Sequence, residues 1–204
     1  MHVWIDFVCP YCFLAAGPLA EALDGLGLDI EWMPFELRPR PQPTLRPEDE
    51  YLQTVWPRSV YPLAARLGVY IRLPEVSPQP YSRLAFEGLQ FAKDCGRTTE
   101  YVRAVLRGFF QRSLDIGDAG VLEMLAREAG LPGTAFRAAL EERRYAAAHD
   151  AALALAHRTR IRAVPTLIFG AHRFEGIPDP AALRRIIEAY LAPGGRRPDA
   201  PSPS

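Results

Sequence analysis

Residues 3–12 read Val3-Trp4-Ile5-Asp6-Phe7-Val8-Cys9-Pro10-Tyr11-Cys12. Residues 3–8 are apolar apart from Asp6, which is typical of a strand buried on both faces. The apolar residues after Cys12 recur with helical spacing and predict a helix, which Pro18 should kink because proline removes a backbone donor. A second strand is expected around residues 28–37. The order of strand, cysteine pair, helix and strand predicts a βαβ unit with the cysteines at the carboxyl end of the first strand.

The two cysteines are spaced i, i+3 at the point where the strand is expected to enter the helix. A helix N-terminus offers unpaired N–H groups and the positive end of the helix dipole, and both favour a thiolate at Cys9. Pro10 suits the first helical turn, and Tyr11 carries a phenol that can touch a substrate or line the rim. Cys12 lies one turn further and is expected to be more shielded. The motif therefore predicts thiol–disulfide exchange in which Cys9 attacks and Cys12 resolves the mixed disulfide.

Half of a zinc site is one alternative interpretation of the cysteine pair, and a pair without a function is the other. A structural zinc site takes four ligands, usually with a second closely spaced pair. The remaining candidate ligands form no such pair, which favours redox chemistry without a metal; they are Cys95, His2, His149, His157 and His172. We expect the thiol of Cys95 to pack on the apolar face of a helix, and we assign the histidines no role.

Asp6 and Glu36 are carboxylates within segments that otherwise resemble strands. Either is a candidate acceptor for the proton that Cys12 must lose before it attacks. A hydrogen-bonded carboxylate with a purely structural role is the favoured interpretation for both, and the acceptor role is the alternative.

Composition excludes several classes of partner. The 204 residues contain 24 Lys plus Arg and 24 Asp plus Glu, so no global field favours nucleic acid or an acidic membrane. No apolar run reaches the roughly 18 residues of a membrane-spanning helix. The amino terminus lacks the basic and apolar regions of a signal peptide, and three cysteines are too few for a disulfide scaffold. We therefore expect a cytoplasmic protein.

The middle of the chain has a different character. Prolines between residues 39 and 47 mark a break, after which helical spacing of apolar residues continues to about residue 158. Asp118 is the expected N-cap of one of these helices. The start of this segment is rich in aromatic residues, for which core packing is the default and lining a groove the alternative; they are Tyr51, Trp56, Tyr61 and Tyr70.

Strand character returns at residues 164–169 and near 173–174, and Asp179 with Pro180 predicts the start of a last helix. The two ends of the chain therefore resemble halves of one α/β domain that a helical segment interrupts. We predict a discontinuous α/β domain at 1–40 and 159–193, a helical insertion at 41–158, and a disordered tail rich in Pro, Gly and Ser at 194–204.

The second half of the predicted site is Val164-Pro165, at the start of an apolar strand. A proline there costs a ladder hydrogen bond. A cis Val164–Pro165 bond would leave the backbone of Val164 open to pair with an extended substrate, whereas the trans form is commoner for X–Pro bonds. We expect the cis form, packed beside Cys9.

Residues 7–14, together with several segments further along the chain, resemble the DsbA-like oxidoreductases, in particular the FrnE-type subgroup. The similar downstream segments are residues 84–88, 109–111, 115–118 and 163–166. The resemblance extends from Val3 to about Leu191. It implies a thioredoxin fold, with a mixed central sheet flanked by helices and a large all-helical insertion.

The same resemblance places the nucleophilic and resolving cysteines at Cys9 and Cys12, and the cis-proline loop at Val164-Pro165. Tyr11 departs from the commoner Cys-Pro-Trp-Cys of the subgroup, and Ala163 and residues 176–178 depart from its glycine-richer loops. The departures bear on the substrate rather than on the chemistry.

The function expected from these features is disulfide exchange with protein or small thiol partners. It needs no cofactor beyond the Cys9–Cys12 pair, and glutathione is a candidate electron partner. One alternative is a glutathione-dependent transferase of the kappa class or a hydroxychromene-carboxylate isomerase, which generally carry serine in place of the first cysteine. The other is a redox-sensing or chaperone-like binder without catalysis. Oxidant, reductant and isomerase roles all fit the motif, since potentials in this fold span about −270 to −120 mV.

Overall fold

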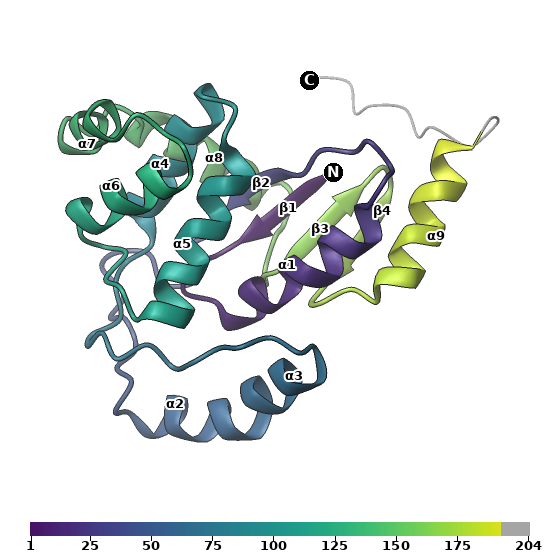
Figure 1. The fold of residues 1–204 in the computed structure, drawn as a ribbon, viewed down its shortest axis with the longest axis horizontal. Coiled ribbons are helices and arrows are strands. Elements are labelled where there is room, and N and C mark those ends of the chain that lie inside the picture. Colours follow the sequence, from purple (N-terminus) through teal and green to yellow (C-terminus); the bar gives the residue numbers. More distant parts are fainter. Residues whose placement is uncertain (193–204) are drawn as a thin grey trace.

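The central sheet joins the two ends of the chain. The computed structural model describes residues 1–192, and within them the sheet has four strands. In spatial order they are β2 (Glu31–Pro34), β1 (His2–Ile5), β3 (Thr166–Phe169) and β4 (His172–Glu175). β1 pairs parallel with β2 and antiparallel with β3, and β3 pairs antiparallel with β4 (Figure 1). The mixed sheet predicted from the sequence is confirmed.

Two strands are shorter than predicted. β2 ends at Pro34; the N–H of Phe35 still donates to the carbonyl of Ile5 at 2.9 Å, and that of Leu37 donates to Asp6 Oδ2 at 2.7 Å. β3 begins at Thr166 because the preceding proline has no N–H to donate.

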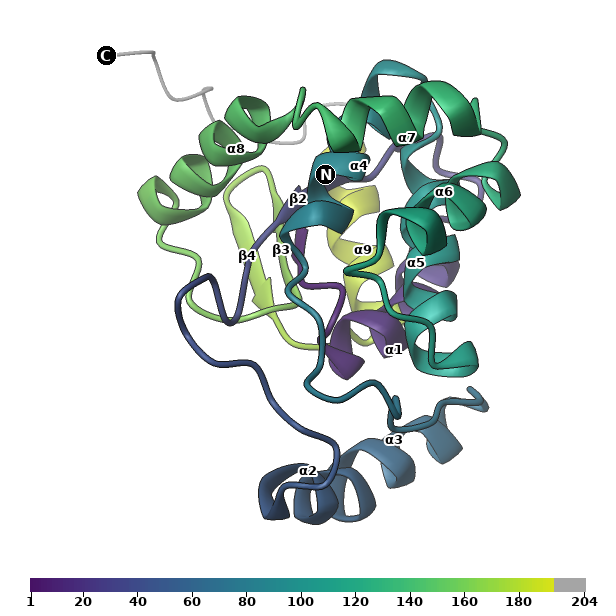
Figure 2. The same cartoon turned by 90° about the vertical axis from the view of Figure 1, so that its left-hand side faces the viewer.

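Alternate side chains of β1 face two different helical layers, as the strand period of two requires. Val3 and Ile5 belong to the core that includes α1 (Pro10–Leu23) and α9 (Pro180–Leu191), which pack against each other. Trp4 points the other way, into a smaller cluster with residues of β2 and of α8 (Ala146–Arg158). Figure 2 shows α8 on one side of the sheet and α1 with α9 on the other.

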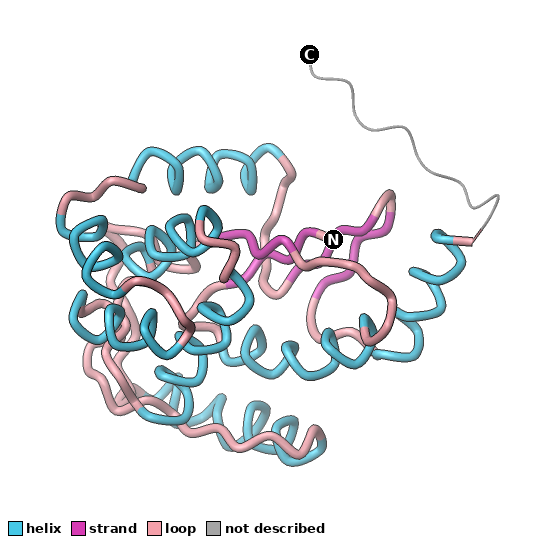
Figure 3. Tube along the Cα trace, turned by 45° about the horizontal axis from the view of Figure 1, so that its top comes forward, coloured by secondary structure: helices cyan, strands magenta, loops and turns pink. Residues whose placement is uncertain are grey.

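The residues between β2 and β3 are mainly helical, as predicted, and surround the sheet at one end (Figure 3). Before α8 they form α2 (Glu50–Val55), the π-helical segment η1 (Trp56–Val60), α3 (Tyr61–Arg66), α4 (Arg83–Asp94), α5 (Thr98–Arg112), α6 (Ala119–Glu128) and α7 (Gly133–Glu141). Their core is continuous with that of the sheet, because Phe7 packs on Phe86 of α4 and Tyr101 of α5 at ring-centroid distances of 4.6 and 6.3 Å. The predicted disordered tail at 194–204 lies outside the described residues.

The predicted N-caps are confirmed. Asp118 accepts a hydrogen bond from the N–H of Val121 at 2.8 Å, and Asp179 accepts one from Ala182 at 2.7 Å, with Pro180 as the first residue of α9. No helix within residues 1–192 has the length and hydrophobicity needed to cross a membrane.

The expectation for Cys95 is wrong. This residue is exposed, not packed on an apolar face. α4 ends at Asp94, and Cys95 is its C-cap, followed by Gly96 with a φ of +64°. The turn that ends the helix therefore lifts the thiol away from the face on which Gly88 and Ala92 lie.

Gly88 allows α4 to pack closely against α5 and α7. A Cβ at this position would lie 2.7 Å from Phe136 Cζ and 2.9 Å from Tyr101 Cζ. We expect Gly88→Ala to lower the free energy of unfolding by about 1–3 kcal/mol through overpacking, measured by urea denaturation.

Gly17→Ala is the matched control, because Gly17 is also helical but a Cβ there would meet nothing within 4 Å. We expect it to raise the free energy of unfolding by about 0.5–1 kcal/mol through helix propensity. Equal effects of the two substitutions would contradict the close packing at Gly88.

Candidate active site

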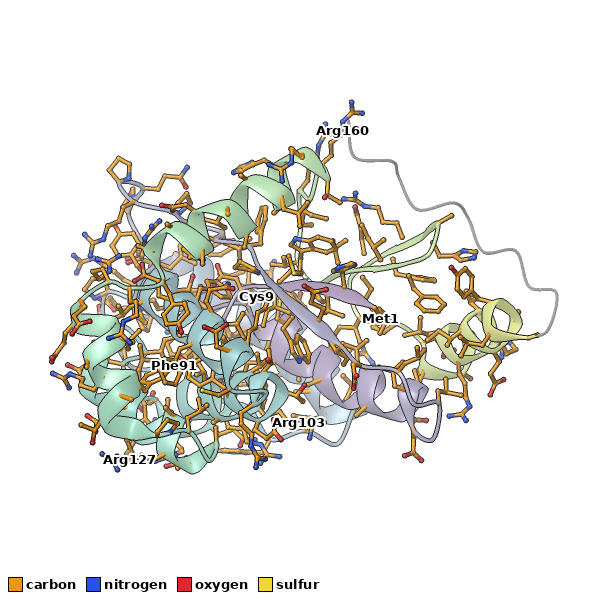
Figure 4. All side chains as sticks on the ribbon, turned by 90° about the horizontal axis from the view of Figure 1, so that it is seen from above. Met1, Cys9, Phe91, Arg103, Arg127 and Arg160 are labelled. Atoms are coloured by element: carbon orange, nitrogen blue, oxygen red, sulfur yellow. The ribbon has the colours of Figure 1, made fainter. Side chains whose placement is uncertain are left out.

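Cys9 lies at the junction between β1 and α1. It is the N-cap of α1, with extended backbone angles of φ −92° and ψ 114°, and Pro10 is the first helical residue. Its carbonyl accepts hydrogen bonds from the N–H groups of Cys12 and Phe13 at 3.1 and 3.4 Å, so the helix starts without using the thiol as a cap. Figure 4 shows Cys9 in the middle of the molecule, whereas Arg127 and Arg160 lie at its periphery.

The Val164–Pro165 loop lies directly beside Cys9. The thiol of Cys9 donates to the carbonyl oxygen of Val164 at an Sγ–O distance of 3.5 Å, although 155 residues separate the two. The Val164–Pro165 peptide bond is cis, and the carbonyl of Pro165 accepts a hydrogen bond from Gly176 at 2.8 Å. The structure thus brings together the two sequence segments that we singled out for this site.

Cys12 lies one helical turn beyond Cys9 and is more deeply enclosed, with 1% of its surface exposed against 4% for Cys9. Burial raises the pKa of the Cys12 thiol well above its ordinary value, and the neighbouring Cys9 sulfur adds to this effect. The backbone N–H of Asp6 acts in the opposite direction. Cys12 is therefore protonated at neutral pH, and its reaction as a nucleophile requires a base.

Asp6 is a buried carboxylate next to the cysteine pair. Its Oδ2 accepts a hydrogen bond from the N–H of Leu37 at 2.7 Å, and its Oδ1 accepts one from Val8 at 3.4 Å. Burial raises the pKa of Asp6 to about 6, against the effect of hydrogen bonds from Ser82, Leu37 and Val8. The charge of Asp6 is near enough to contribute to the raised pKa of Cys12. Asp6 is thus a base close to the thiol that must lose a proton.

Glu36, the other candidate acceptor, already has a partner. Its Oε1 lies 2.6 Å from Nε2 of His149, and both side chains are buried, with 4% and 0% of their surfaces exposed. The ring of His149 stacks on Phe86 at a centroid distance of 5.6 Å. Sequence reasoning missed this pair, because 113 residues separate its members and no local pattern connects them. The pairing leaves Asp6 as the carboxylate available to Cys12.

A cavity of about 140 Å³ opens at Cys9. One wall is apolar and comes from Leu45 and from the segment that carries Leu52, Val55 and Trp56. Of the aromatic residues noted in this part of the sequence, Tyr51 and Trp56 line the cavity, together with Tyr11 of the motif. Polar groups at the cavity are Asp6, Arg38, Thr44, Gln79 and Ser82. Sequence reasoning did not identify Arg38 and Gln79, which lie in proline-rich loops without a recognisable motif.

No group of three His, Cys, Asp or Glu side chains within residues 1–192 is arranged to hold a metal ion. The chemistry that the described site offers is therefore that of two thiols, one carboxylate and an adjacent backbone loop.

A cysteine pair at the start of the helix that follows the first strand of a mixed sheet, facing a proline loop, defines a thioredoxin-like oxidoreductase architecture. The chain belongs to the DSBA-like thioredoxin domain family, whose sequence profile matches residues 1–188. It is 46% identical over 172 residues to the uncharacterized protein YwbO of Bacillus subtilis, covering 83% of this chain and 86% of that protein.

Two solved structures have the same fold. A probable DsbA oxidoreductase of Streptomyces coelicolor superposes with a TM-score of 0.75 at 22% identity, over 98% of this chain and 92% of that one. The cytosolic disulfide reductase DsbM of Pseudomonas aeruginosa, solved with GSH, gives a TM-score of 0.70 at 19% identity, over 93% and 98% of the two chains. The predicted DsbA-like fold is therefore confirmed, while membership of the FrnE-type subgroup stays a prediction.

The raised pKa of Asp6 links stability to pH. Its value of about 6 in the folded protein exceeds the ordinary 3.8, so the folded state holds this proton more tightly than the unfolded state. The stability that Asp6 contributes is therefore present below 3.8 and is lost as the pH rises to about 6.

We expect Asp6→Asn to remove this loss. Relative to the wild type, the variant should gain about 3 kcal/mol in free energy of unfolding as the pH rises from below 3.8 to above 6, which is the equivalent of the difference between the two pKa values. Urea denaturation of both proteins on each side of this window measures the gain. A stability difference independent of pH would show that Asp6 has an ordinary pKa.

Proposed function

We propose that this protein is a thiol–disulfide oxidoreductase that uses Cys9 and Cys12 as its redox pair. The observation that carries the proposal is the position of Cys9: it is the N-cap of α1, and its sulfur lies 3.5 Å from the carbonyl of Val164. The positive end of the helix dipole favours negative charge at this position. Cys12 lies within one helical turn, where it can reach the same sulfur.

The reaction takes two exchange steps. The Cys9 thiolate attacks one sulfur of a substrate disulfide, a Cys9–substrate bond forms, and the other substrate sulfur leaves as a thiolate. Cys12 then loses its proton and attacks Cys9, which releases the second substrate sulfur and leaves a Cys9–Cys12 disulfide. The substrate gains two electrons and the pair loses two. The reverse order oxidises a substrate dithiol.

Asp6 takes the proton of Cys12 in this proposal. The pKa of Asp6, about 6, is close to neutrality, where a general base is most effective. Its carboxylate belongs to the same buried group as Cys12, and Glu36 is engaged by His149. When the substrate is oxidised rather than reduced, the same carboxyl returns the proton.

Thiol or disulfide groups of proteins and small thiols are the substrates of the proposed reaction, and glutathione is the proposed electron partner. The fold shared with DsbM, which was solved with GSH, supports glutathione, and the description of that protein as cytosolic supports a cytoplasmic location. The backbone of Val164 beside Cys9 is the proposed contact for the main chain of a substrate.

A glutathione-dependent transferase or isomerase is less consistent with the site, because neither reaction needs a resolving thiol one turn beyond the first. A binder without catalysis does not need a base beside Cys12. The pair of thiols with its adjacent carboxylate therefore favours disulfide exchange.

Serine substitutions distinguish the roles of the two cysteines. We expect Cys12→Ser to accumulate long-lived mixed disulfides with substrate, because the attacking thiol remains and the resolving one is lost. Cys9→Ser should form none and should lose all exchange activity. Both variants need a Cys95→Ser background, since Cys95 is exposed. Mass spectrometry of the adducts measures the outcome, and trapping by Cys9→Ser instead would reverse the assignment.

Asp6→Asn tests the proposed base. Removal of a general base typically costs about 10²–10⁴-fold in rate, so we expect resolution of the mixed disulfide to slow by at least about 10²-fold. The wild-type resolution rate should fall as the pH drops through about 6, and the variant should lose this dependence. The decay of a mixed disulfide, followed by rapid acid quenching, measures both. An unchanged pH profile would assign the proton to another acceptor.

A further inference from the structure

Arg38 is a half-buried cation that no acidic group neutralises. Arg38 lines the cavity at Cys9, and its guanidinium makes no ion pair or hydrogen bond with any residue of 1–192. Asp6 lines the same cavity, where it accepts a hydrogen bond from the backbone N–H of Leu37, and Glu36 contacts His149; neither forms an ion pair with Arg38. An unpaired cation in a partly desolvated cavity is a site for an anion.

Gln79 is a second polar group without a protein partner at the same cavity. Only 6% of its surface is exposed, and its backbone N–H donates to the carbonyl of Leu45 at 2.8 Å. Its side-chain amide forms no hydrogen bond within the described part of the chain, yet it lines the cavity. The amide is open to the cavity, so a ligand bound there can form a hydrogen bond with it.

The rest of the cavity is suited to a small hydrocarbon group of a ligand. Leu45, Leu52, Val55 and Trp56 form the apolar wall, and the volume of about 140 Å³ is that of a single ring or branched hydrocarbon group. The cation, the amide, the apolar wall and the carboxylate of Asp6 line the same cavity as Cys9.

We propose that this cavity binds low-molecular-weight disulfides that carry a carboxylate on a ring or a branched hydrocarbon. The carboxylate pairs with Arg38, the amide of Gln79 hydrogen-bonds to a polar group of the ligand, and the hydrocarbon packs on the wall at Trp56. This inference rests on the proposed function and names the substrate class for the same pair of cysteines.

The form of the cavity favours a small molecule over an extended polypeptide. Its lining comes from four separate segments of the chain, at residues 6–11, 37–45, 51–56 and 79–82. The volume of about 140 Å³ accommodates a single ring or branched group, which is less than several residues of an extended chain need.

The reaction in the cavity balances without another reagent when the protein starts with both cysteines reduced. Cys9 attacks the ligand disulfide and releases one carboxylate-bearing thiol, and Cys12 then releases the second and closes the Cys9–Cys12 disulfide. The ligand gains two electrons and the cysteine pair loses two.

Two aromatic disulfides that differ in charge test the proposal in a single turnover. Dithiobis(nitrobenzoate) carries one carboxylate on each ring, and dithiodipyridine carries none. The reduced protein in a Cys95→Ser background is mixed with each reagent, and the released thiol is followed by stopped-flow absorbance. We expect Arg38→Gln to slow the reaction with dithiobis(nitrobenzoate) by about tenfold and to leave the reaction with dithiodipyridine unchanged.

Three further variants distinguish specific binding of the ligand carboxylate at Arg38 from a general effect of the protein's net charge. Arg38→Lys keeps the charge and should retain most of the rate. Arg40→Gln makes the same change in net charge two residues away, where Arg40 stacks on Tyr81 outside this cavity, and should have no effect. Gln79→Leu should slow the reaction with dithiobis(nitrobenzoate) by roughly threefold and leave the reaction with dithiodipyridine unchanged.

Equal slowing of both reagents by Arg38→Gln would overturn the proposal, because it would mean that Arg38 acts on Cys9 rather than on the ligand. If Arg38→Gln and Arg40→Gln slow the reaction with dithiobis(nitrobenzoate) equally, the proposal is overturned, because the positive charge of the protein would then attract the anionic reagent without a specific site. A disulfide-bonded peptide without acidic residues that reacts faster than dithiobis(nitrobenzoate) would assign the cavity to polypeptides instead. If wild-type protein forms no Cys9–Cys12 disulfide even with dithiodipyridine, the proposed function itself fails, whatever the result at Arg38.

Discussion

The antiparallel pairing of β1 with β3 brings two distant parts of the chain together at one end of these two central strands. Trp4 pairs with Thr166, and because the strands run in opposite directions the end of β1 meets the start of β3. Cys9 follows the first strand and Val164-Pro165 precedes the other, which places the thiol next to the carbonyl of Val164. Both faces of β1 are buried, so a register slip by one residue would move Trp4 from the α8 side into the opposite core. Burial thereby fixes the geometry of the site.

Burial around the cysteine pair determines when Cys12 can attack in the proposed reaction. Burial raises the pKa of both Cys12 and Asp6, and the Cys9 sulfur raises that of Cys12 further. Once Cys9 is joined to a substrate it is part of a disulfide, and its contribution to the raised pKa of Cys12 disappears. The proton of Cys12 therefore becomes easier to remove at the stage when Cys12 must attack. The resolving step is held back until a mixed disulfide exists.

Features that depend on neighbouring residues were predictable from the sequence. The cysteine pair at a strand–helix junction, Pro10 in the first turn and the caps at Asp118 and Asp179 each follow from a few adjacent residues. Cys95 was mispredicted because helical spacing was continued past the true end of α4. The buried pair of Glu36 and His149 depends on packing across 113 residues, so no local pattern contains it. The same holds for Gln79, whose position beside Cys9 is fixed only by the folded insertion.

The site divides chemistry and recognition between two parts of the chain. The strand–helix unit supplies Cys9, Cys12 and Asp6, whereas Leu52, Trp56 and Gln79, on the walls of the cavity, come from the helical insertion. Phe7 connects the two parts, because it lies between Asp6 and Cys9 in the chain and packs on Phe86 of α4. Trp56 is held in turn by Phe110 of α5 at a ring-centroid distance of 6.2 Å. The insertion is therefore anchored to the residues around the thiol, and changes in its wall can alter the ligand without disturbing the sheet that positions the cysteines.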